Sequence, residues 1–189
     1  MGEYEDKMTL PDEDVIYLAT QGDKDAFSIL YQKYINKIYT YIYYRTGNAN
    51  DAEDLTARVF YRALGHIKSY QQKGVPFSAC LYRIAHNIVA NWHRDNSRRK
   101  EVSLEDHLEL PHQGDHPEMT LVQNQAAEDL MVEIRKLPSE RQQLIILKFV
   151  ERLSNSEVAM IMGRSEGAIK SLYHRTLTSL RFYVAKEEG

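Results

Sequence analysis

The sequence predicts an all-α protein with two small helical domains joined by a flexible linker. The strong apolar patterns recur with the helical period, and no strand-like alternation of useful length is found. Residues 111–117, PHQGDHP, place two prolines and a glycine inside an acidic stretch, which is typical of a linker. The 189 residues, 43% of them hydrophobic, are enough for one or two cores. We expect a first domain over 1–100, an acidic linker over 101–122 and a second domain over 123–189.

Charge is unevenly distributed along the chain, although the net charge is only −3. Residues 92–100, WHRDNSRRK, are strongly basic, and residues 101–131 contain eight acidic residues and neither lysine nor arginine (Glu101, Glu105, Asp106, Glu109, Asp115, Glu118, Glu128 and Asp129). Blocks of opposite sign predict segments with different electrostatic partners.

Several classes of protein are disfavoured by simple features. The single cysteine, Cys80, excludes an internal disulfide and fits a reducing compartment. The polar, acidic N-terminal stretch MGEYEDKMTLPDED does not read as a signal peptide. No run approaches the ~18 apolar residues of a membrane span. We therefore expect a cytoplasmic protein without membrane insertion.

The first long helix is expected over residues 25–46, with Gly47 in the left-handed conformation that ends many helices. Its apolar and aromatic residues share one broad stripe, which predicts a core-facing surface. The stripe consists of Phe27, Leu30, Tyr31, Tyr34, Ile35, Ile38, Tyr41 and Ile42.

The second helix is expected over residues 51–64. Asn50 is predicted to cap it, with Glu53 completing a capping box. The inward face comprises Ala52, Leu55, Val59 and Ala63, and the outward face comprises Asp51, Asp54, Arg58, Tyr61 and Arg62. That outward face is either ordinary solvated charge or a docking surface, since interfaces favour aromatic residues and arginine. The residues alone leave both interpretations open.

The third helix is expected to begin after Pro76 and to run from an apolar half into the basic block. Phe77, Leu81, Ile84, Ala85, Ile88 and Trp92 form its buried stripe, and Arg83, His86, Asn87, Asn91, Arg94 and Arg98 lie on exposed faces. Amides and arginines near the rings of Tyr82 and Trp92 suit single-stranded nucleic acid, because rings stack on bases and arginines hold phosphates. A solvated helix end, whose cations favour the helix dipole, is the other interpretation.

The last two helices have the signature of a helix-turn-helix. Ser154 with Glu157 predicts a capping box at the start of the first helix, and Gly163 can end it in the left-handed conformation. The connector Gly163, Arg164 and Ser165 has the length that this motif uses, and Ser165 can cap the second helix.

The second of these helices has one apolar and one polar face. Ile169, Leu172, Thr176, Leu177 and Leu180 face the core, and Lys170, Ser171, His174 and Arg175 share the opposite face. A bend within a helical core would not need this polar and cationic face, whereas a recognition helix does. The pattern therefore predicts DNA binding.

Three stretches together resemble a bacterial extracytoplasmic-function (ECF) sigma factor of the sigma-70 family. They are DAEDLTARVFYRAL, FSACLYRIAHNIVANWHR and LPSERQQLIILKFVERLSNSEVAMIMGRSEGAIKSLYHRTLTSLR, in the order and separation of that family, and the similarity extends from about Asp25 to Phe182. The resemblance implies a sigma region 2 helical bundle and a sigma region 4 helix-turn-helix. It implies a protein that binds core RNA polymerase, recognises the −10 and −35 promoter elements and promotes DNA melting. Such a protein is not an enzyme and needs no cofactor.

The resemblance also assigns roles to residues. It implies core polymerase binding by Asp51, Asp54, Leu55, Arg58, Tyr61 and Arg62. It implies −10 DNA binding by Asn87, Asn91, Arg94 and Arg98, with the loop 69–76 supplying pocket walls, and −35 DNA binding by Arg164, Ser165, Lys170, Ser171, His174 and Arg175. Ala57 and Arg58 stand where family members often carry Gln-Glu, which reverses a charge. An anti-sigma factor is a further expected partner.

The acidic linker and its histidines allow other interpretations. In the family the linker threads through polymerase, so its charge either mimics nucleic acid or only keeps a disordered tether in solution. His107, His112 and His116 could form a zinc site, but their spacing across two prolines and a glycine defines no common face. Cys80, on an apolar helix, is expected to be an inert thiol.

A different class of function also fits the residues. The chain could be a helix-turn-helix regulator whose first domain senses a ligand or a protein and never touches polymerase. Co-purification separates the two, because only a sigma factor binds core polymerase without DNA.

Overall fold

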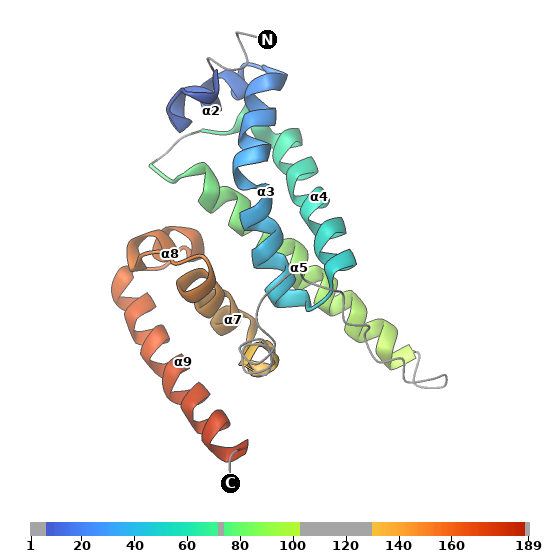
Figure 1. Ribbon diagram of the computed structural model, residues 1–189, viewed down its shortest axis with the longest axis vertical. Helices are drawn as coiled ribbons and strands as arrows, with labels where there is room; N and C mark the ends of the chain where they lie inside the picture. The colour runs from blue at the N-terminus through green and yellow to red at the C-terminus, as the bar shows by residue number, and fades with distance from the viewer. Residues whose placement is uncertain (1–6, 72–73, 103–129, 188–189) are drawn as a thin grey trace, which may run out of the picture.

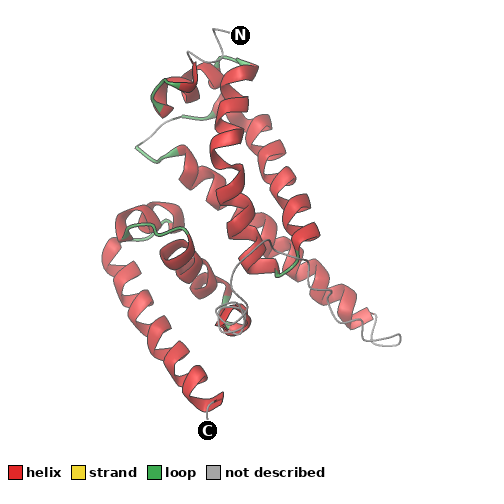
Figure 2. Ribbon diagram, viewed as in Figure 1, coloured by secondary structure: helices red, strands yellow, loops and turns green. Residues whose placement is uncertain are grey.

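The computed structural model describes residues 7–71, 74–102 and 130–187, and within these ranges every regular element is a helix (Figure 2). The all-α expectation is therefore confirmed. Most of the expected linker, including residues 111–117 and the three histidines His107, His112 and His116, lies outside the described residues. Among the helices that are described, none is both long and apolar enough to cross a membrane.

The first domain is a bundle of three long helices and a shorter one. Its elements are α2 (Asp12–Thr20), α3 (Lys24–Thr46), α4 (Ala49–His66), the short 3-10 helix η1 (Ile67–Ser69) and α5 (Phe77–Val102). Figure 1 shows α3, α4 and α5 as neighbouring rods, with α2 at one end of the bundle. The aromatic stripe of α3 supplies much of the core, where Tyr34, Ile38, Tyr41 and Ile42 are buried. The core-facing interpretation is therefore confirmed for most of that stripe, but it is wrong for Tyr31, which is 39% exposed at the edge of the stripe.

The turn between α3 and α4 explains where both helices end. Gly47 adopts the expected left-handed conformation (φ 70°), and its N–H donates to the Tyr43 carbonyl at 2.8 Å. The chain leaves it extended at Asn48, whose side-chain oxygen accepts from the Asp51 N–H at 3.0 Å. The predicted cap at Asn50 is therefore wrong, because the left-handed glycine starts the helix earlier and Asn50 already lies in its first turn.

The second domain contains a helical segment over 130–136, α7 (Ser139–Ile145), the π-helical turn η2 (Ile146–Val150), α8 (Asn155–Met162) and α9 (Glu166–Glu187). Ser154 and Glu157 form the predicted capping box, and Gly163 is left-handed with φ 65°. The Ser165 hydroxyl accepts from the Ala168 N–H at 3.2 Å, as a cap for α9 should. The sequence signals for a helix-turn-helix are thus all realised in α8 and α9.

The two domains pack against each other through α7, η2 and α8. Buried residues of the second domain, among them Leu144, Leu147 and Val158, belong to the same apolar cluster as Tyr34 and Ile38 of the first. In Figure 1, α8 lies beside α5, and α9 lies on the far side of α7 from the first domain. The structure is therefore closed, with one core continuing across the domain boundary.

Candidate nucleic-acid and polymerase interfaces

The outer face of α4 presents charged and aromatic side chains to solvent. Asp54, Arg58 and Arg62 are exposed, and Tyr61 is 80% exposed. Leu64, three residues beyond Tyr61, is also half exposed and extends this surface by one helical turn. The sequence reasoning omitted Leu64, although its spacing from Tyr61 was a usable signal.

Two other residues expected on this face lie differently. Leu55 is only 2% exposed, because it shares the inward stripe of α4 with Ala52 and Val59. Its buried position excludes direct contact with a partner in this conformation, so it supports the face from beneath. Asp51 is half-buried, and its Oδ1 accepts from Trp92 Nε1 of α5 at 3.3 Å. Asp51 therefore joins α4 to α5 at the margin of the exposed face.

The exposed side of α5 carries the predicted amide and arginine residues in one row. Asn87, Asn91, Arg94 and Arg98 are all exposed, and their spacing of three or four residues aligns them along the helix. Arg94 donates from Nη2 to Asn91 Oδ1 at 2.7 Å, which holds these two side chains together on the row. The row presents hydrogen-bond donors and positive charge along about three turns of helix.

The expected place of Tyr82 beside the strand-binding surface is wrong. Tyr82 is 2% exposed, with its ring edge-on to Tyr41 at a centroid distance of 5.3 Å. Tyr82 lies on the buried side of α5, next to the buried Leu81. Trp92 is half-buried, and its N–H is engaged by Asp51. Tyr82 is thus unavailable for stacking on a base, and the amides and arginines remain as the binding chemistry of α5.

The polar face of α9 has the predicted arrangement. Lys170, Ser171, His174 and Arg175 are exposed. On the opposite side Ile169, Leu172, Thr176 and Leu180 are buried, as expected. Arg175 donates from Nε to the Ser171 carbonyl at 3.4 Å, so its guanidinium lies beside the preceding turn of the helix. The helix therefore combines a buried stripe with a cationic surface near its N-terminal half.

The turn residues of the predicted −35 set already have partners within the protein. Ser165 caps α9 through its hydroxyl, and Arg164 forms an ion pair with Glu140 of α7. Both residues lie directly before the start of α9.

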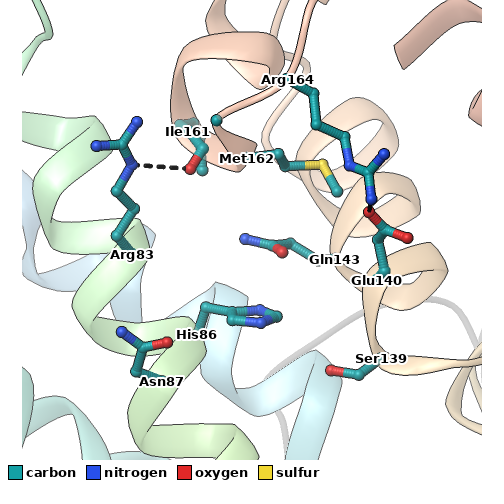
Figure 3. Close-up of a pocket in the computed structure, with 10 residues that line it drawn as sticks. Arg83, His86, Asn87, Ser139, Glu140, Gln143, Ile161, Met162 and Arg164 are labelled. Atoms are coloured by element: carbon teal, nitrogen blue, oxygen red, sulfur yellow. Dashed lines mark hydrogen bonds and ion pairs between the residues drawn. The ribbon is translucent and has the colours of Figure 1, made fainter. Parts of the chain in front are cut away.

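A polar groove of about 520 Å³ separates α5 from α7 and α8. Figure 3 shows Asn87 and Arg164 on its opposite walls. The groove is lined by Arg83, His86, Asn87, Ser139, Glu140, Gln143, Ile161, Met162, Gly163 and Arg164. One residue predicted for the −10 element and one predicted for the −35 element are thus brought to a single groove. The exposed face of α9 lies outside it.

A buried arginine lies beneath this groove. Arg45, at the end of α3, is fully buried and donates from Nη1 to the Tyr41 hydroxyl at 2.9 Å and from Nη2 to the Ser139 hydroxyl at 2.6 Å. Its Nη1 also lies 3.0 Å from His86 Nδ1. Burial, together with the neighbouring Arg45 charge, lowers the pKa of His86 to about 4. His86 is therefore neutral near pH 7, and its Nδ1 can accept from the guanidinium.

A second polar contact crosses the domain boundary nearby. The Tyr82 hydroxyl donates to Glu151 Oε2 at 2.7 Å. Burial raises the pKa of Glu151, and the hydrogen bond from Tyr82 partly opposes that rise. Sequence reasoning missed both contacts, because each joins residues that are far apart along the chain.

Over the described residues no group of three His, Cys, Asp or Glu side chains is placed to hold a metal ion. Cys80 is half-buried, and burial raises the pKa of its thiol, which favours the unreactive protonated form.

Comparison with known proteins identifies the two domains. The family model for Sigma-70 region 2 matches residues 30–99, and the model for Sigma-70, region 4 matches residues 127–180. The solved complex of CnrH with the cytosolic domain of CnrY matches with a TM-score of 0.70 and 17% identity, covering 93% of this chain and 97% of that chain. The sigma factor RpoE in complex with the anti-sigma factor NepR, from Bartonella quintana, matches with a TM-score of 0.64 and 20% identity, covering 84% and 96%. These helical domains define a protein of the sigma-70 class.

Curated relatives narrow the class further. The ECF RNA polymerase sigma factor SigW of Bacillus subtilis is 32% identical over 173 residues, which cover 85% of this chain and 90% of that protein. BldN of Streptomyces coelicolor, also named an ECF RNA polymerase sigma factor, is 36% identical over 167 residues, or 88% of this chain. The matched region spans 63% of the length of BldN and 65% of SigE from Mycolicibacterium smegmatis. The chain belongs to the ECF sigma factors of the sigma-70 family.

Proposed function

We propose that this protein binds core RNA polymerase, recognises the −10 and −35 promoter elements and promotes DNA melting at the start of transcription. It acts in the cytoplasm by binding alone, without a cofactor and without making or breaking bonds. The observation that carries this proposal is the presence of both sigma-70 domains in one chain, each with a polar and cationic helix face on α5 or α9. The working division is a region 2 domain over 1–100, a linker over 101–122 and a region 4 domain over 123–189.

Polymerase docks on the outer face of α4 in this proposal. Asp54, Arg58, Tyr61 and Arg62 make the contacts, because they are exposed and combine charge with an aromatic anchor. Asp51 stands at the edge of the contact, and Leu55 acts only by packing beneath it.

The −35 element binds α9. Lys170, Ser171, His174 and Arg175 enter the major groove, with phosphate contacts fixing the position and one or two base edges fixing the sequence. Arg164 and Ser165, next to the N-terminus of this long helix, lie where its backbone N–H groups and dipole attract a phosphate.

The −10 element binds α5 as a melted strand. Asn87 captures an extruded base, and Asn91, Arg94 and Arg98 hold the strand beside it. These contacts offset an unstacking cost of a few kcal/mol per base step. Polymerase supplies the catalytic chemistry.

An anti-sigma factor is part of the proposal as a regulatory partner. Its support is that the two similar structures are complexes, one of CnrH with CnrY and one of RpoE with the anti-sigma factor NepR. The competing function is that of a helix-turn-helix regulator that does not bind polymerase. Only the DNA-binding motif itself favours that function.

Run-off transcription with purified core polymerase and genomic promoter fragments tests the proposal. We expect the full chain to bind core polymerase without DNA and to support specific initiation. A chain that binds promoter fragments but does not co-purify with core polymerase would contradict the sigma-factor assignment and support the competing one.

A further inference from the structure

A buried amide without a partner points into the groove between α5 and α7. Gln143 of α7 is only 5% exposed, and no hydrogen-bond partner for its carboxamide lies in the described part of the chain. Figure 3 shows its side chain reaching into the groove between His86 and Met162. Buried polar groups are nearly always hydrogen-bonded, because an unpaired one costs free energy. The exception at Gln143 indicates a ligand that supplies the missing partner.

The groove around Gln143 is rich in hydrogen-bond donors. Arginine can only donate, so His86 Nδ1 accepts from Arg45, and the neutral imidazole carries its proton on Nε2. The Ser139 hydroxyl also accepts from Arg45 and keeps its own proton to donate. Arg83 uses Nε and Nη2 for α8 and keeps Nη1. A ligand of this groove therefore needs several acceptor atoms.

The charge of the groove indicates the sign of the ligand. Its lining contains two arginines, Arg83 and Arg164, and one carboxylate, Glu140, which pairs with Arg164. Arg45 adds a positive charge beneath the floor of the groove. The excess of positive charge favours an anion, and the fork of a guanidinium matches the oxygens of a phosphate.

Carboxamides from both domains provide a second kind of recognition. Asn87 of α5 and Gln143 of α7 both line the groove. Such amides donate and accept at once, and they can therefore pair with the edge of an adenine base. Ile161 and Met162 of α8 add an apolar wall on which the base can pack. The volume of about 520 Å³ is within the range of small-molecule sites.

We propose that this groove binds a free nucleoside monophosphate with an adenine base. Gln143 and Asn87 hold the edge of the base, and Arg83 and Arg164 hold the phosphate. A bound nucleotide covers Asn87 and so competes with the −10 strand. That competition rests on the proposed function, whereas the nucleotide site itself does not.

Isothermal titration of the full chain with adenosine 5′-monophosphate tests the site. Gln143→Met keeps the length of the side chain and removes no described hydrogen bond, so its thermal unfolding midpoint should stay within about 2 °C of the parent. We expect it to bind the nucleotide about 10-fold more weakly, and Arg164→Gln to do the same. The matched controls Gln32→Met on α3 and Arg181→Gln on α9, both at exposed positions, should bind like the parent.

Three further probes distinguish the sources of this chemistry. Inorganic phosphate and adenosine each supply half of the ligand, and each should bind at least about 10-fold more weakly than the nucleotide. A short single strand of DNA with one central adenine carries the same base and phosphate. We expect Gln143→Met to bind this strand as the parent does, because the strand reaches Asn87 without the α7 wall.

The inference is overturned if about 1 mM adenosine 5′-monophosphate does not bind, or if Gln143→Met binds it as the parent does. It is also overturned if inorganic phosphate binds equally well, which would indicate a simple anion site, or if Gln143→Met weakens the DNA strand and not the nucleotide. All of these titrations use the protein without polymerase or promoter, so their failure leaves the proposed function untouched.

Discussion

At the scale of single residues, a buried arginine without a carboxylate among its described hydrogen-bond partners has an electrostatic consequence. Arg45 bonds instead to Tyr41, Ser139 and His86. A protonated His86 would place a second positive charge beside the buried guanidinium, at a half-buried position. The stability of this contact therefore depends on His86 being neutral, although Glu140 nearby partly favours its charged form.

This dependence predicts a loss of stability in mild acid. The pKa of His86 is about 4 in the folded protein and about 6.5 when unfolded, so the unfolded chain binds a proton that the folded chain does not. The contribution of His86 to the free energy of unfolding is complete above about pH 6.5 and falls as pH drops toward 4. Glu151 has a raised pKa, so its contribution to the free energy of unfolding changes with pH in the opposite direction. Because Glu151 is present in both proteins compared below, its contribution cancels in the comparison.

Denaturant unfolding of the parent chain and of His86→Gln, measured from pH 7.5 to pH 5, checks this prediction. We expect the parent to lose stability relative to His86→Gln as the pH falls, because the glutamine cannot be protonated. Parallel pH profiles for the two proteins would show that His86 does not titrate as proposed.

At the scale of elements, the α4 surface offers a test of docking. Asp54→Arg with Tyr61→Ala reverses a charge and removes an exposed aromatic without touching the core, so the fold should persist. We expect core polymerase binding to weaken at least about 10-fold, since interface aromatics often contribute more than 1 kcal/mol.

Titration of labelled protein with core polymerase measures the loss, and circular dichroism checks the fold. Glu13→Arg with Tyr17→Ala on α2 makes the same chemical changes on another exposed helix and should bind like the parent. Equal affinities for the α4 and α2 variants would remove α4 as the docking surface.

The recognition helix α9 allows base contacts to be separated from phosphate contacts. Arg175 has the planar fork that suits a guanine edge, and Lys170 is a point charge suited to phosphate. Arg175→Ala should relax preference at one −35 position by roughly 1–3 kcal/mol. Lys170→Ala should lower the affinity for all DNA sequences. It should also reduce by about one the slope of the logarithm of affinity against the logarithm of salt concentration.

Affinities of the full chain for a set of single-base −35 duplexes, at several salt concentrations, provide the measurement. Arg181→Ala, an exposed arginine further along α9, is the matched control. An Arg175→Ala protein with unchanged affinity and base preference would mean that this helix face does not read DNA.

How well the sequence predicted each element depended on whether the signal was local. The capping box of Ser154 and Glu157 and the left-handed Gly163 are decided within a few residues, and they were predicted correctly. The cap at Asn48 was missed because Asn50 offers a similar local pattern, and only the geometry after Gly47 distinguishes the two. Tyr82 was misjudged because the side of α5 on which a residue lies depends on packing with α3 and η2.

At the scale of the whole molecule, the contacts that close the protein had no sequence signal. Arg45 meets Ser139 across 94 positions, and Arg83 meets Ile161 across 78. Neither pair forms a periodic or capping pattern that could be recognised beforehand. The domain arrangement was therefore beyond sequence reasoning, whereas the two domains themselves were predictable.

The closed arrangement predicts that the two DNA surfaces of the free protein differ in availability. Asn87 is exposed but lines the groove between the domains, where α7 and α8 restrict the approach of a strand, while Lys170, His174 and Arg175 lie on α9 outside that groove. Loosening the contact of Tyr82 with Glu151 between the domains should therefore help the −10 strand to bind and leave binding of the −35 duplex unaffected. For Tyr82→Phe we expect about 5- to 10-fold tighter binding of the single-stranded −10 segment, because the fraction of open molecules rises. The affinity of Tyr82→Phe for the −35 duplex should stay within about twofold of the affinity of the parent chain.

Fluorescence anisotropy of the full chain with each probe, both taken from a promoter that supports run-off transcription, measures the difference. Tyr34→Phe, which loses a similar buried hydroxyl–carboxylate bond inside the first domain, should change neither affinity. Equal gains for both probes would indicate that Tyr82→Phe loosens the protein generally. No gain for the −10 strand would mean that closure does not limit access to Asn87. A gain confined to the −10 strand requires both that α5 reads that strand and that the domain contact covers it.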